Sequence, residues 1–388
     1  MAEHVVVLGS GYAGAGAIKS LEASLDGEAT LTWVSDVDHH LVLHEAHRCI
    51  CDPEVREKVA IPIPEIKSPG TAFRQGAVAE IDTDGRTVHL EDGTTIDYDY
   101  VLVGLGTQTE FYGIAGLEEH AHTLKNLDDV LGIHEDVTAK ARDATAGDPV
   151  AVVVGGAGLS GIQTAGELAE LRDERALPIE IHLVEGLDNV LPQSDPSLQA
   201  ALRERLETRD IHIRTGEFIG EVDEDTVYVG EDDPLAYDVL VWTGGITGPE
   251  AVRNSTVEKD QRTHRIKAGQ DFRTDHDRVF AIGDCALIDQ PDGAPAPPTA
   301  QAAWQAAEVA GRNITRAIRG QPLEKWTHTD KGTVVSVGEA AVAHDVSVVP
   351  FVDTFGGLPA SFLKKAIAAR WISDVTGIGR ALDAWSDM

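Results

Sequence analysis

The stretch His4-Val5-Val6-Val7-Leu8-Gly9-Ser10-Gly11-Tyr12-Ala13-Gly14 decides the fold class of this chain. Its apolar run predicts a buried parallel strand, and the GxGxxG pattern formed by Gly9, Gly11 and Gly14 predicts a tight turn into a helix over residues 15–25. In such a turn the first glycine allows the bend, the second lets a pyrophosphate approach the backbone, and the third lets helix and strand pack closely. A second strand is predicted over residues 31–34, and Asp36 follows it where a ribose-binding acid is expected.

The same pattern occurs again in the middle of the chain. Residues 149–154 predict a strand, and residues 162–171 predict the helix that follows its turn. That turn contains a second GxGxxG, made by Gly156, Gly158 and Gly161. The next strand, over residues 179–184, ends at Glu185, which suits a ribose 2′-hydroxyl and repels a 2′-phosphate, so we expect NADH rather than NADPH. This repeat predicts an α/β fold with two Rossmann-like dinucleotide-binding domains.

Other predicted strands also end in small residues, which leaves space for a bulky ligand close to the backbone. They end at Gly106-Thr107, at Gly244-Gly245 and at Gly283-Asp284. The first two follow charged hairpins, predicted over residues 87–98 and 226–237.

A helix is predicted to begin near Thr299 and Ala300, after Asp284 and a loop rich in Pro and Gly. Asp284 can accept hydrogen bonds from sugar or ribityl hydroxyls. The positive end of the helix suits a ring that becomes negative on reduction, such as a flavin. The alternative is a strand, a loop and a capped helix without a ligand.

The order of the motifs predicts that the second dinucleotide-binding domain is inserted in the first. We expect the first domain at residues 1–115 and 248–325, and the second at residues 116–247. Residues 326–388 form a C-terminal region, with a small sheet over residues 334–344.

The net charge of −33, from 65 acidic and 32 basic residues, is extreme. We interpret it as halophilic adaptation to multimolar salt, where the Debye length falls to roughly 3 Å. A nucleic-acid partner is not expected. No apolar run reaches the length of a membrane span, and residues 1–8 leave no room for a signal peptide, so the expected location is the cytoplasm or the inner face of the membrane.

Histidines and cysteines gather in residues 39–51. Helical spacing would place His40, His44 and His47 on one face, but no second set of ligands follows, and no metal site is predicted. The three cysteines, Cys49, Cys51 and Cys285, do not form a disulfide framework.

The C-terminal segment over residues 355–372 predicts a basic amphipathic helix. Leu363, Ile367 and Trp371 share a helical face, and Lys364, Lys365 and Arg370 occur there with no acid between residues 361 and 372. Such helices often lie in a membrane interface. The alternative is a helix that packs its apolar face on the core.

Across nearly its full length the chain resembles flavoproteins with two dinucleotide-binding domains, the pyridine nucleotide-disulfide reductase-like superfamily. Within it the chain is most similar to type II NADH dehydrogenases, the single-subunit NADH:quinone oxidoreductases of respiratory chains. The segments that carry this likeness are 111–118, 161–168, 242–245 and 300–305. The last, Ala300-Gln301-Ala302-Ala303-Trp304-Gln305, matches an AQxAxQ pattern that lines the quinone pocket in that family.

The resemblance implies FAD, NADH and a quinone, with hydride transfer from NADH to the flavin, two electrons passed on to the quinone and no proton pumping. It implies that Gly9, Gly11, Gly14, Asp36 and Asp284 hold FAD, with Gly106, Thr107, Thr299, Ala300 and Gln301 nearby. NADH is expected on Gly156, Gly158, Gly161 and Glu185, with Gly244 and Gly245. A homodimer is expected.

The expected reaction site consists of Gln301, Gln305, Gln163 and Lys364. Gln301 and Gln305 are at i and i+4, so their amides share a helical face that can orient quinone carbonyls. The alternative is that both merely cap and solvate the helix. Gln163 stands where the family usually has Glu, and it cannot titrate. Lys364 matches a place where relatives have a basic residue or Trp near the quinone.

Three rival functions share this fold. A thiol- or disulfide-linked reductase would use Cys49, although a Cys-x-Cys bridge with Cys51 closes a strained ring. A sulfide:quinone oxidoreductase needs a cysteine after the second glycine loop, and the chain has none between Cys51 and Cys285. A slow NADH-responsive flavoprotein would differ in lacking quinone turnover.

Overall fold

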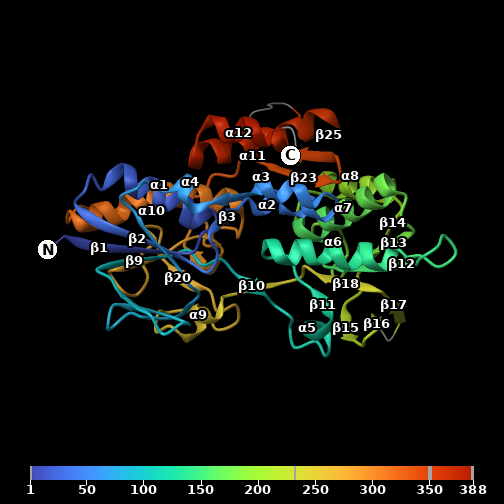
Figure 1. The fold of residues 1–388 in the computed structure, drawn as a ribbon, viewed down its shortest axis with the longest axis horizontal. Coiled ribbons are helices and arrows are strands. Elements are labelled where there is room, and N and C mark those ends of the chain that lie inside the picture. Colours follow the sequence, from blue (N-terminus) through green and yellow to red (C-terminus); the bar gives the residue numbers. More distant parts are fainter. Residues whose placement is uncertain (1, 231–232, 348–351, 386–388) are drawn as a thin grey trace.

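Two five-stranded parallel sheets form the centre of the protein. The computed structural model describes residues 2–230, 233–347 and 352–385, and Figure 1 shows the two sheets side by side. The first has the order β21 (Val279–Ala281), β9 (Tyr100–Val103), β1 (Glu3–Leu8), β2 (Ala29–Ser35) and β5 (Ala72–Gln75). The second has the order β11 (Ala121–His122), β18 (Val239–Trp242), β12 (Val150–Gly155), β13 (Ile179–Glu185) and β14 (Ile211–Thr215). The predicted α/β class is therefore confirmed.

The two sheets repeat one design. In the first sheet β1, which precedes the glycine loop, lies between β2, which follows the loop helix, and β9, which follows a hairpin. In the second sheet β12 lies in the same way between β13 and β18. These central strands are almost wholly buried, as expected for parallel sheets covered on both faces. The loop helices are α1 (Tyr12–Ser24) and α7 (Leu159–Arg175), and both begin three residues before the predicted start. The predicted helix start was too late, because the second glycine of each loop, Gly11 or Gly158, is the N-cap. The third glycine, Gly14 or Gly161, therefore lies in the first turn of the helix.

The predicted hairpins are present as small antiparallel sheets. They consist of β6 (Val78–Asp82), β7 (Thr87–Leu90) and β8 (Thr95–Asp97), and of β15 (Ile219–Val222), β16 (Thr226–Val229) and β17 (Asp233–Ala236). The chain leaves the first half through β10 (Gln108–Thr109) and returns through β19 (Ile246–Thr247), which pair antiparallel (Figure 1). All strands of the second sheet thus lie in sequence between β9 and β21 of the first.

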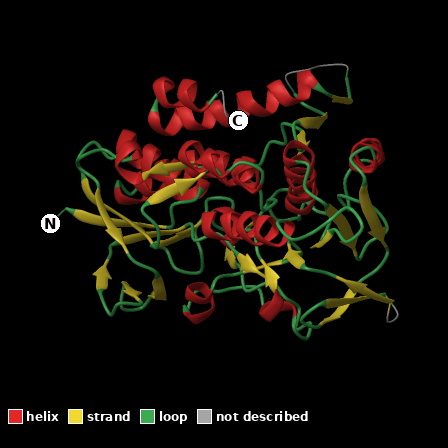
Figure 2. Ribbon diagram, turned by 45° about the vertical axis from the view of Figure 1, so that its right-hand side comes forward, coloured by secondary structure: helices red, strands yellow, loops and turns green. Residues whose placement is uncertain are grey.

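Helices α1 and α10 (Ala300–Ile318) pack closely because small residues face each other. A Cβ on Gly16 would lie 2.8 Å from the Cβ of Ala307, and one on Gly311 would lie 2.5 Å from Ser20 Oγ. In Figure 2 most helices stand above the strands. The remaining longer helices are α6 (Leu127–Ala141) and α8 (Pro196–Glu207). Shorter ones are α2 (Leu43–Ala46), α3 (Arg56–Val59), α4 (Ile63–Ile66), α5 (Leu117–His120), α9 (Glu250–Asn254), η1 (His47–Ile50), η2 (Pro53–Val55) and η3 (Gly283–Cys285).

The C-terminal region adds a three-stranded sheet and two helices along the upper edge of Figure 1. These elements are β23 (Thr333–Val337), β24 (Ala340–His344), β25 (Thr354–Gly356), α11 (Leu358–Thr376) and α12 (Ile378–Ala384). Two further strand pairs are β3 (His39–Leu41) with β4 (Ala60–Pro62), and β20 (Ile266–Ala268) with β22 (Ala286–Ile288). The region packs on both halves, since α11 touches α1 and β23 touches α7.

Candidate functional site

The first glycine loop has the geometry of a phosphate-binding turn. Gly9 has a φ of +96°, and a Cβ on it would lie 2.3 Å from the carbonyl oxygen of Gly104. A Cβ on Gly14 would lie 1.8 Å from the carbonyl oxygen of Gly9, whereas one on Gly11 would meet nothing within 4 Å. No side chain caps the N-terminus of α1. Its first N–H groups are therefore left for an anionic ligand above Gly11.

The second glycine loop repeats this geometry. Gly156 has a φ of +94°, a Cβ on Gly161 would lie 1.8 Å from the carbonyl oxygen of Gly156, and one on Gly158 would meet nothing within 4 Å. The N-terminus of α7 also lacks a side-chain cap. Both loops thus have a geometry that fits a dinucleotide pyrophosphate: a bend at the first glycine, open space at the second and close packing at the third.

Two side chains that the sequence reading missed support the loops. Trp33 Nε1 donates to the carbonyl oxygen of Gly9 at 2.8 Å. Thr243 Oγ1 donates to the carbonyl oxygens of Gly155 and Gly156 at 2.9 and 3.0 Å. Neither contact has a sequence signal, because both join residues from different strands.

The two predicted ribose acids follow equivalent strands. Glu185, at the end of β13, accepts from the backbone N–H of Ala157 at 2.7 Å and of Leu187 at 3.0 Å. These bonds connect the second glycine loop to the end of β13. A carboxylate has about four acceptor positions, so Glu185 can still accept hydrogen bonds from hydroxyls. Asp36 is exposed after β2, and its Oδ1 accepts from the N–H of Val37 at 3.0 Å.

The Gly-Asp motif lies where α1 and α10 meet. A Cβ on Gly283, which has a φ of +72°, would lie 2.9 Å from the Cβ of Ala13 and 3.8 Å from that of Ala303. Burial raises the pKa of the adjacent Asp284, and the positive charges of Lys125 and Arg265 oppose that rise. Lys125, which the sequence reading also missed, donates from Nζ to Thr107 Oγ1 at 3.3 Å. Asp284, Lys125 and Thr107 are therefore brought together near the first glycine loop.

Helix α10 begins as predicted, with Thr299 as its cap accepting from the N–H of Ala302 at 3.2 Å. Gln301 and Gln305 share one face, since Gln305 Nε2 lies 3.4 Å from Gln301 Oε1. Their amides bind the backbone of residues 329–332. Gln301 accepts from the N–H of Lys331 at 2.9 Å and donates to the carbonyl of Gly332 at 3.2 Å. Gln305 bonds both backbone groups of Thr329, at 2.9 and 3.1 Å.

An aromatic group next to these glutamines joins α1, α10 and α11. Trp304 packs edge-on against Trp371 with ring centroids 4.9 Å apart, and Trp371 lies 4.6 Å from the ring of Tyr12. Trp371 Nε1 donates to His40 Nε2 at 2.8 Å. Burial lowers the pKa of His40 to about 4, so this ring is neutral and can accept.

A set of ionisable side chains is buried between α2, η1, α7, β23 and α11. We call it the buried ionisable cluster. Its buried members are Glu45, His47, Arg48, Glu167 and Lys364, and the partly exposed His44 adjoins Glu45. Lys364 Nζ lies 3.1 Å from His47 Nε2 and 3.6 Å from Glu45 Oε1. His47 Nε2 is 3.0 Å from Ser336 Oγ and 4.0 Å from Glu167 Oε1. Tyr12, which follows Gly11, bonds His44 through its hydroxyl.

Gln163 joins this cluster to the second glycine loop. Its side-chain amide lies 3.0 Å from His47 Nε2. In the orientation that satisfies both amide atoms, its oxygen accepts from Lys364 Nζ at 2.8 Å and its nitrogen donates to the carbonyl of Leu159 at 3.3 Å. The four predicted reaction-site residues thus form two pairs, Gln163 with Lys364 and Gln301 with Gln305.

Burial dominates the electrostatics of the cluster. It lowers the pKa of Lys364 to about 8, lowers that of His44 to about 4 and places that of His47 well below its usual range. It raises the pKa of Glu167 to about 8. Burial also disfavours the charged form of Glu45, but Lys364 and other nearby cations outweigh it and lower the pKa of Glu45. At neutral pH the cluster therefore holds protons on Lys364 and Glu167.

The expectation that His40, His44 and His47 share one helical face was wrong, and the apolar face of α11 is only partly covered. His40 lies on β3, His44 on α2 and His47 on η1, so one helix does not carry all three. In α11 the buried residues are Ala360, Lys364, Ala368, Trp371, Ile372 and Val375. Ile367 is 36% exposed and Leu363 only partly buried, so of the predicted apolar face Trp371 alone is fully covered. The face is rotated because the partners of Lys364 draw it inward.

The three cysteines are buried and free. Burial raises the pKa of Cys49 to about 12 and that of Cys285 to about 11, and it raises the pKa of Cys51 still further. A thiol acts as a nucleophile through its thiolate. These environments therefore disfavour thiol chemistry.

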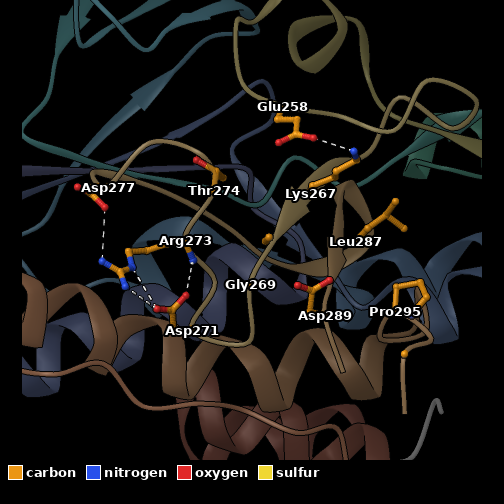
Figure 3. A pocket seen from close by; sticks show the side chains of 12 residues that line it. Glu258, Lys267, Gly269, Asp271, Arg273, Thr274, Asp277, Leu287, Asp289 and Pro295 are labelled. Atoms are coloured by element: carbon orange, nitrogen blue, oxygen red, sulfur yellow. Dashed lines mark hydrogen bonds and ion pairs between the residues drawn. The ribbon is translucent and has the colours of Figure 1, made fainter. Parts of the chain in front are cut away.

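A surface cavity of about 650 Å³ is lined by residues of β20, β22 and the loops next to them. Figure 3 shows that its charges pair with one another: Lys267 with Glu258 at 2.7 Å, and Arg273 with Asp271 and Asp277. None of its lining residues belongs to the predicted cofactor set. In the described residues no group of three or more His, Cys, Asp or Glu could hold a metal ion. No helix among the described residues is long and apolar enough to cross a membrane.

Comparison with known proteins agrees with this geometry. The family described as pyridine nucleotide-disulphide oxidoreductase matches residues 3–307. The type II NADH:quinone oxidoreductase of Staphylococcus aureus (strain NCTC 8325 / PS 47) is 29% identical over 396 residues, which is 97% of each chain.

Two solved structures share the fold. NDH2 from Plasmodium falciparum in complex with NADH superposes with a TM-score of 0.84 at 16% identity, covering 100% of this chain and 98% of that one. The sulfide:quinone oxidoreductase from Aquifex aeolicus gives a TM-score of 0.81 at 19% identity, covering 97% and 92%.

Proposed function

The chain belongs to the pyridine nucleotide-disulphide oxidoreductase family, and from this premise we propose that it uses FAD to oxidise NADH and reduce a quinone. The observation that carries the proposal is the duplicated loop geometry, in which Gly11 and Gly158 each open a helix N-terminus to a ligand. Two such sites suit an enzyme that holds two dinucleotides at once. The full-length likeness to a type II NADH:quinone oxidoreductase supports quinone as the acceptor.

The two halves divide the cofactors between them. We propose an FAD domain at residues 1–115 and 248–325, an NADH domain at residues 116–247 and a C-terminal region at residues 326–388. FAD is held by Gly9, Gly11, Gly14, Asp36, Gly106, Thr107, Asp284, Thr299 and Ala300. NADH is held by Gly156, Gly158, Gly161, Glu185, Gly244 and Gly245.

A bound FAD supplies the two-electron redox chemistry between NADH and the quinone. The N-terminus of α10 directs its dipole toward the negative charge that develops on reduction. Gln301 and Gln305 orient the quinone carbonyls beside Trp304. Gln301 donates one N–H to the carbonyl of Gly332 and keeps the other for a quinone carbonyl. Gln305 bonds Gln301 Oε1 and the carbonyl of Thr329, so it holds Gln301 in position.

The reaction consumes a proton, because the hydride of NADH carries two electrons and one proton, whereas a quinol needs two protons. Lys364 is the proposed holder of that proton, since it is buried and burial lowers its pKa to about 8. Gln163 does not titrate and is proposed to position Lys364 and His47. The contacts of Gln163 with both support this role.

We propose that α11 and α12 meet the inner face of the cell membrane. Large apolar side chains are exposed on both helices: Leu358, Phe362, Ile378 and Leu382. Arg370 on α11 is also exposed and suits anionic lipid headgroups. The proposal further includes a homodimer and, from the charge of −33, adaptation to high salt.

Two rivals fit less well. A thiol-linked mechanism would need a reactive Cys49, whose burial raises its pKa to about 12. The likeness to sulfide:quinone oxidoreductase is one of fold, and the chain has no cysteine between Cys51 and Cys285.

Anaerobic stopped-flow spectroscopy tests the proposal in two steps. The purified protein should contain near one FAD per chain, lose its flavin absorbance on mixing with NADH, and regain it on mixing with a short-chain quinone. Reduction without reoxidation by quinone would favour a slow NADH-responsive flavoprotein. A folded protein without flavin would contradict the proposal.

A further inference from the structure

The segment that follows β14 is held against the end of β13. Glu185 pairs with Thr215 in the parallel register of these strands. Beyond the strands, the N–H of Gly216 donates to the carbonyl of Leu187 at 2.9 Å, and that of Glu217 donates to the carbonyl of Glu185 at 3.2 Å. Phe218 follows directly, so its position is set relative to the proposed ribose acid.

Phe218 places an exposed aromatic ring beside that acid. Its exposed fraction is 67%, and that of Leu187 is 46%. The ring lies directly against Gly186, since a Cβ there would be 2.5 Å from Phe218 Cδ1 and Cε1. Gly186 therefore leaves room for the ring next to Glu185. An exposed aromatic ring that lies against a glycine, with an exposed leucine next to that glycine in the chain and an acid suited to ribose before it, has the chemistry of a purine platform.

From this arrangement we propose that Phe218 stacks on the adenine ring of NADH, with Leu187 as a second apolar contact. The inference rests on the proposed function, because it takes Glu185 as the acceptor for the adenosine ribose. Adenine is planar and uncharged, so an aromatic face beside the ribose site suits it, and stacking of this kind tolerates water at the rim.

The charges around this subsite disfavour an additional phosphate. Arg214 on β14 is paired with Glu217, with Nε to Oε2 at 2.9 Å, and with Asp233, with Nη2 to Oδ2 at 2.6 Å. Its positive charge is thus already compensated by two carboxylates. Together with Glu185 they oppose a 2′-phosphate electrostatically, so the subsite takes the adenosine of NADH rather than that of NADPH.

The test uses flavin-loaded protein and ADP-ribose, which carries the adenosine but lacks nicotinamide. Isothermal titration calorimetry should show that Phe218→Ala weakens ADP-ribose binding about fivefold or more, as expected for loss of one base–aromatic stack. Phe218→Tyr should restore affinity to within about twofold, because it restores the ring. The matched control is Tyr228→Ala on β16, in the small sheet that begins directly after Phe218, where the Tyr228 hydroxyl donates to Asp223. It should leave ADP-ribose affinity unchanged.

Reduced nicotinamide mononucleotide, which lacks adenine, provides the second arm. Its rate of flavin reduction should be the same in wild type and Phe218→Ala, whereas NADH at low concentration should react more slowly with the variant. Equal ADP-ribose affinity in a folded Phe218→Ala variant would overturn the adenine subsite and leave the proposed function standing. If ADP-ribose binding depends on Phe218 but quinone does not reoxidise the flavin, the subsite stands and the proposed acceptor fails.

Discussion

Lys364 Nζ lies 3.1 Å from His47 Nε2 inside the protein, although the two residues are 317 positions apart in the chain. This contact brings α11 of the C-terminal region to η1 of the first half, and Gln163 of α7 joins it from the second half. A chain of polar groups therefore links Tyr12, beside the first glycine loop, to Gln163, beside the second, through the partly exposed His44 and the buried Glu45 and Lys364.

Wild type should lose stability relative to Glu167→Gln as pH rises from about 5 to about 8. Burial raises the pKa of Glu167 to about 8. The folded protein thus keeps a proton that the unfolded chain releases above about pH 4, and the stability due to that proton is lost as pH rises toward the folded pKa. Urea denaturation at pH 5 and pH 8.5 measures the difference. Glu118→Gln, on the exposed face of α5, is the control. A wild-type-to-variant difference that is independent of pH would contradict the assignment.

Glu45 and Lys364 should be energetically coupled by about 1–3 kcal/mol, because both are buried and their charges lie 3.6 Å apart. A double-mutant cycle with Glu45→Gln and Lys364→Met, followed by urea denaturation, measures this coupling. The control cycle is the exposed pair Lys267 and Glu258, which is shorter at 2.7 Å. It should show the weaker coupling because water screens it. A larger coupling energy for the exposed pair than for the buried pair would show that burial does not strengthen the interaction of Glu45 with Lys364.

Wild type should prefer NADH over NADPH, and Glu185→Ser should lower that preference by about tenfold, or about 1.4 kcal/mol. In the role proposed for Glu185, its carboxylate accepts from the ribose hydroxyls and repels a 2′-phosphate. Steady-state kcat/KM for both nucleotides gives the ratio. Wild type that prefers NADPH would show that Glu185 does not contact the ribose.

Gln301→Ala and Gln305→Ala should each slow flavin reoxidation by a short-chain quinone at least tenfold, about 1.4 kcal/mol, while reduction by NADH stays near the wild-type rate. Stopped flow separates the two half-reactions.

The matched control for the glutamines is Gln290→Ala. Gln290 Oε1 accepts from the N–H of His328 at 2.7 Å, so it holds the segment next to residues 329–332 without lying on α10. Equal slowing in Gln290→Ala would mean that loosening this segment, and not loss of a quinone contact, causes the effect. Unchanged reoxidation in both α10 variants would place the quinone elsewhere.

The melting temperature should fall when salt is lowered from multimolar concentration toward 0.1 M. With a net charge of −33, unscreened carboxylates repel one another over about 10 Å at that salt. Differential scanning calorimetry across a KCl series measures the change, with sucrose as an uncharged control for general exclusion effects. A salt-independent melting temperature would contradict halophilic adaptation.

The sequence alone determined the two-domain plan, because its signals are local. A buried strand, a loop with three glycines and a helix follow one another over Glu3–Ser24, and the same unit recurs over Val150–Arg175. Gly9 and Gly156 have φ angles of +96° and +94°, which favour glycine. The third glycine of each loop approaches the backbone of the first so closely that a Cβ would not fit. The hairpins, the cap at Thr299 and the i, i+4 pairing of Gln301 with Gln305 are also local and were predicted.

Which side chains meet across these units depends on how the chain folds in three dimensions. Periodicity placed Leu363, Ile367 and Trp371 on one face of α11, but it did not predict that Lys364 is buried. Glu45, His47 and Ser336 converge on its ammonium group from other elements. The three histidines of residues 40–47 likewise lie on separate elements, and Phe218 meets Gly186 only through the pairing of β13 with β14. Helical and strand periods report the local direction of a side chain. Compensation of a buried charge depends on groups far away in the chain, and a periodic pattern carries no information about them.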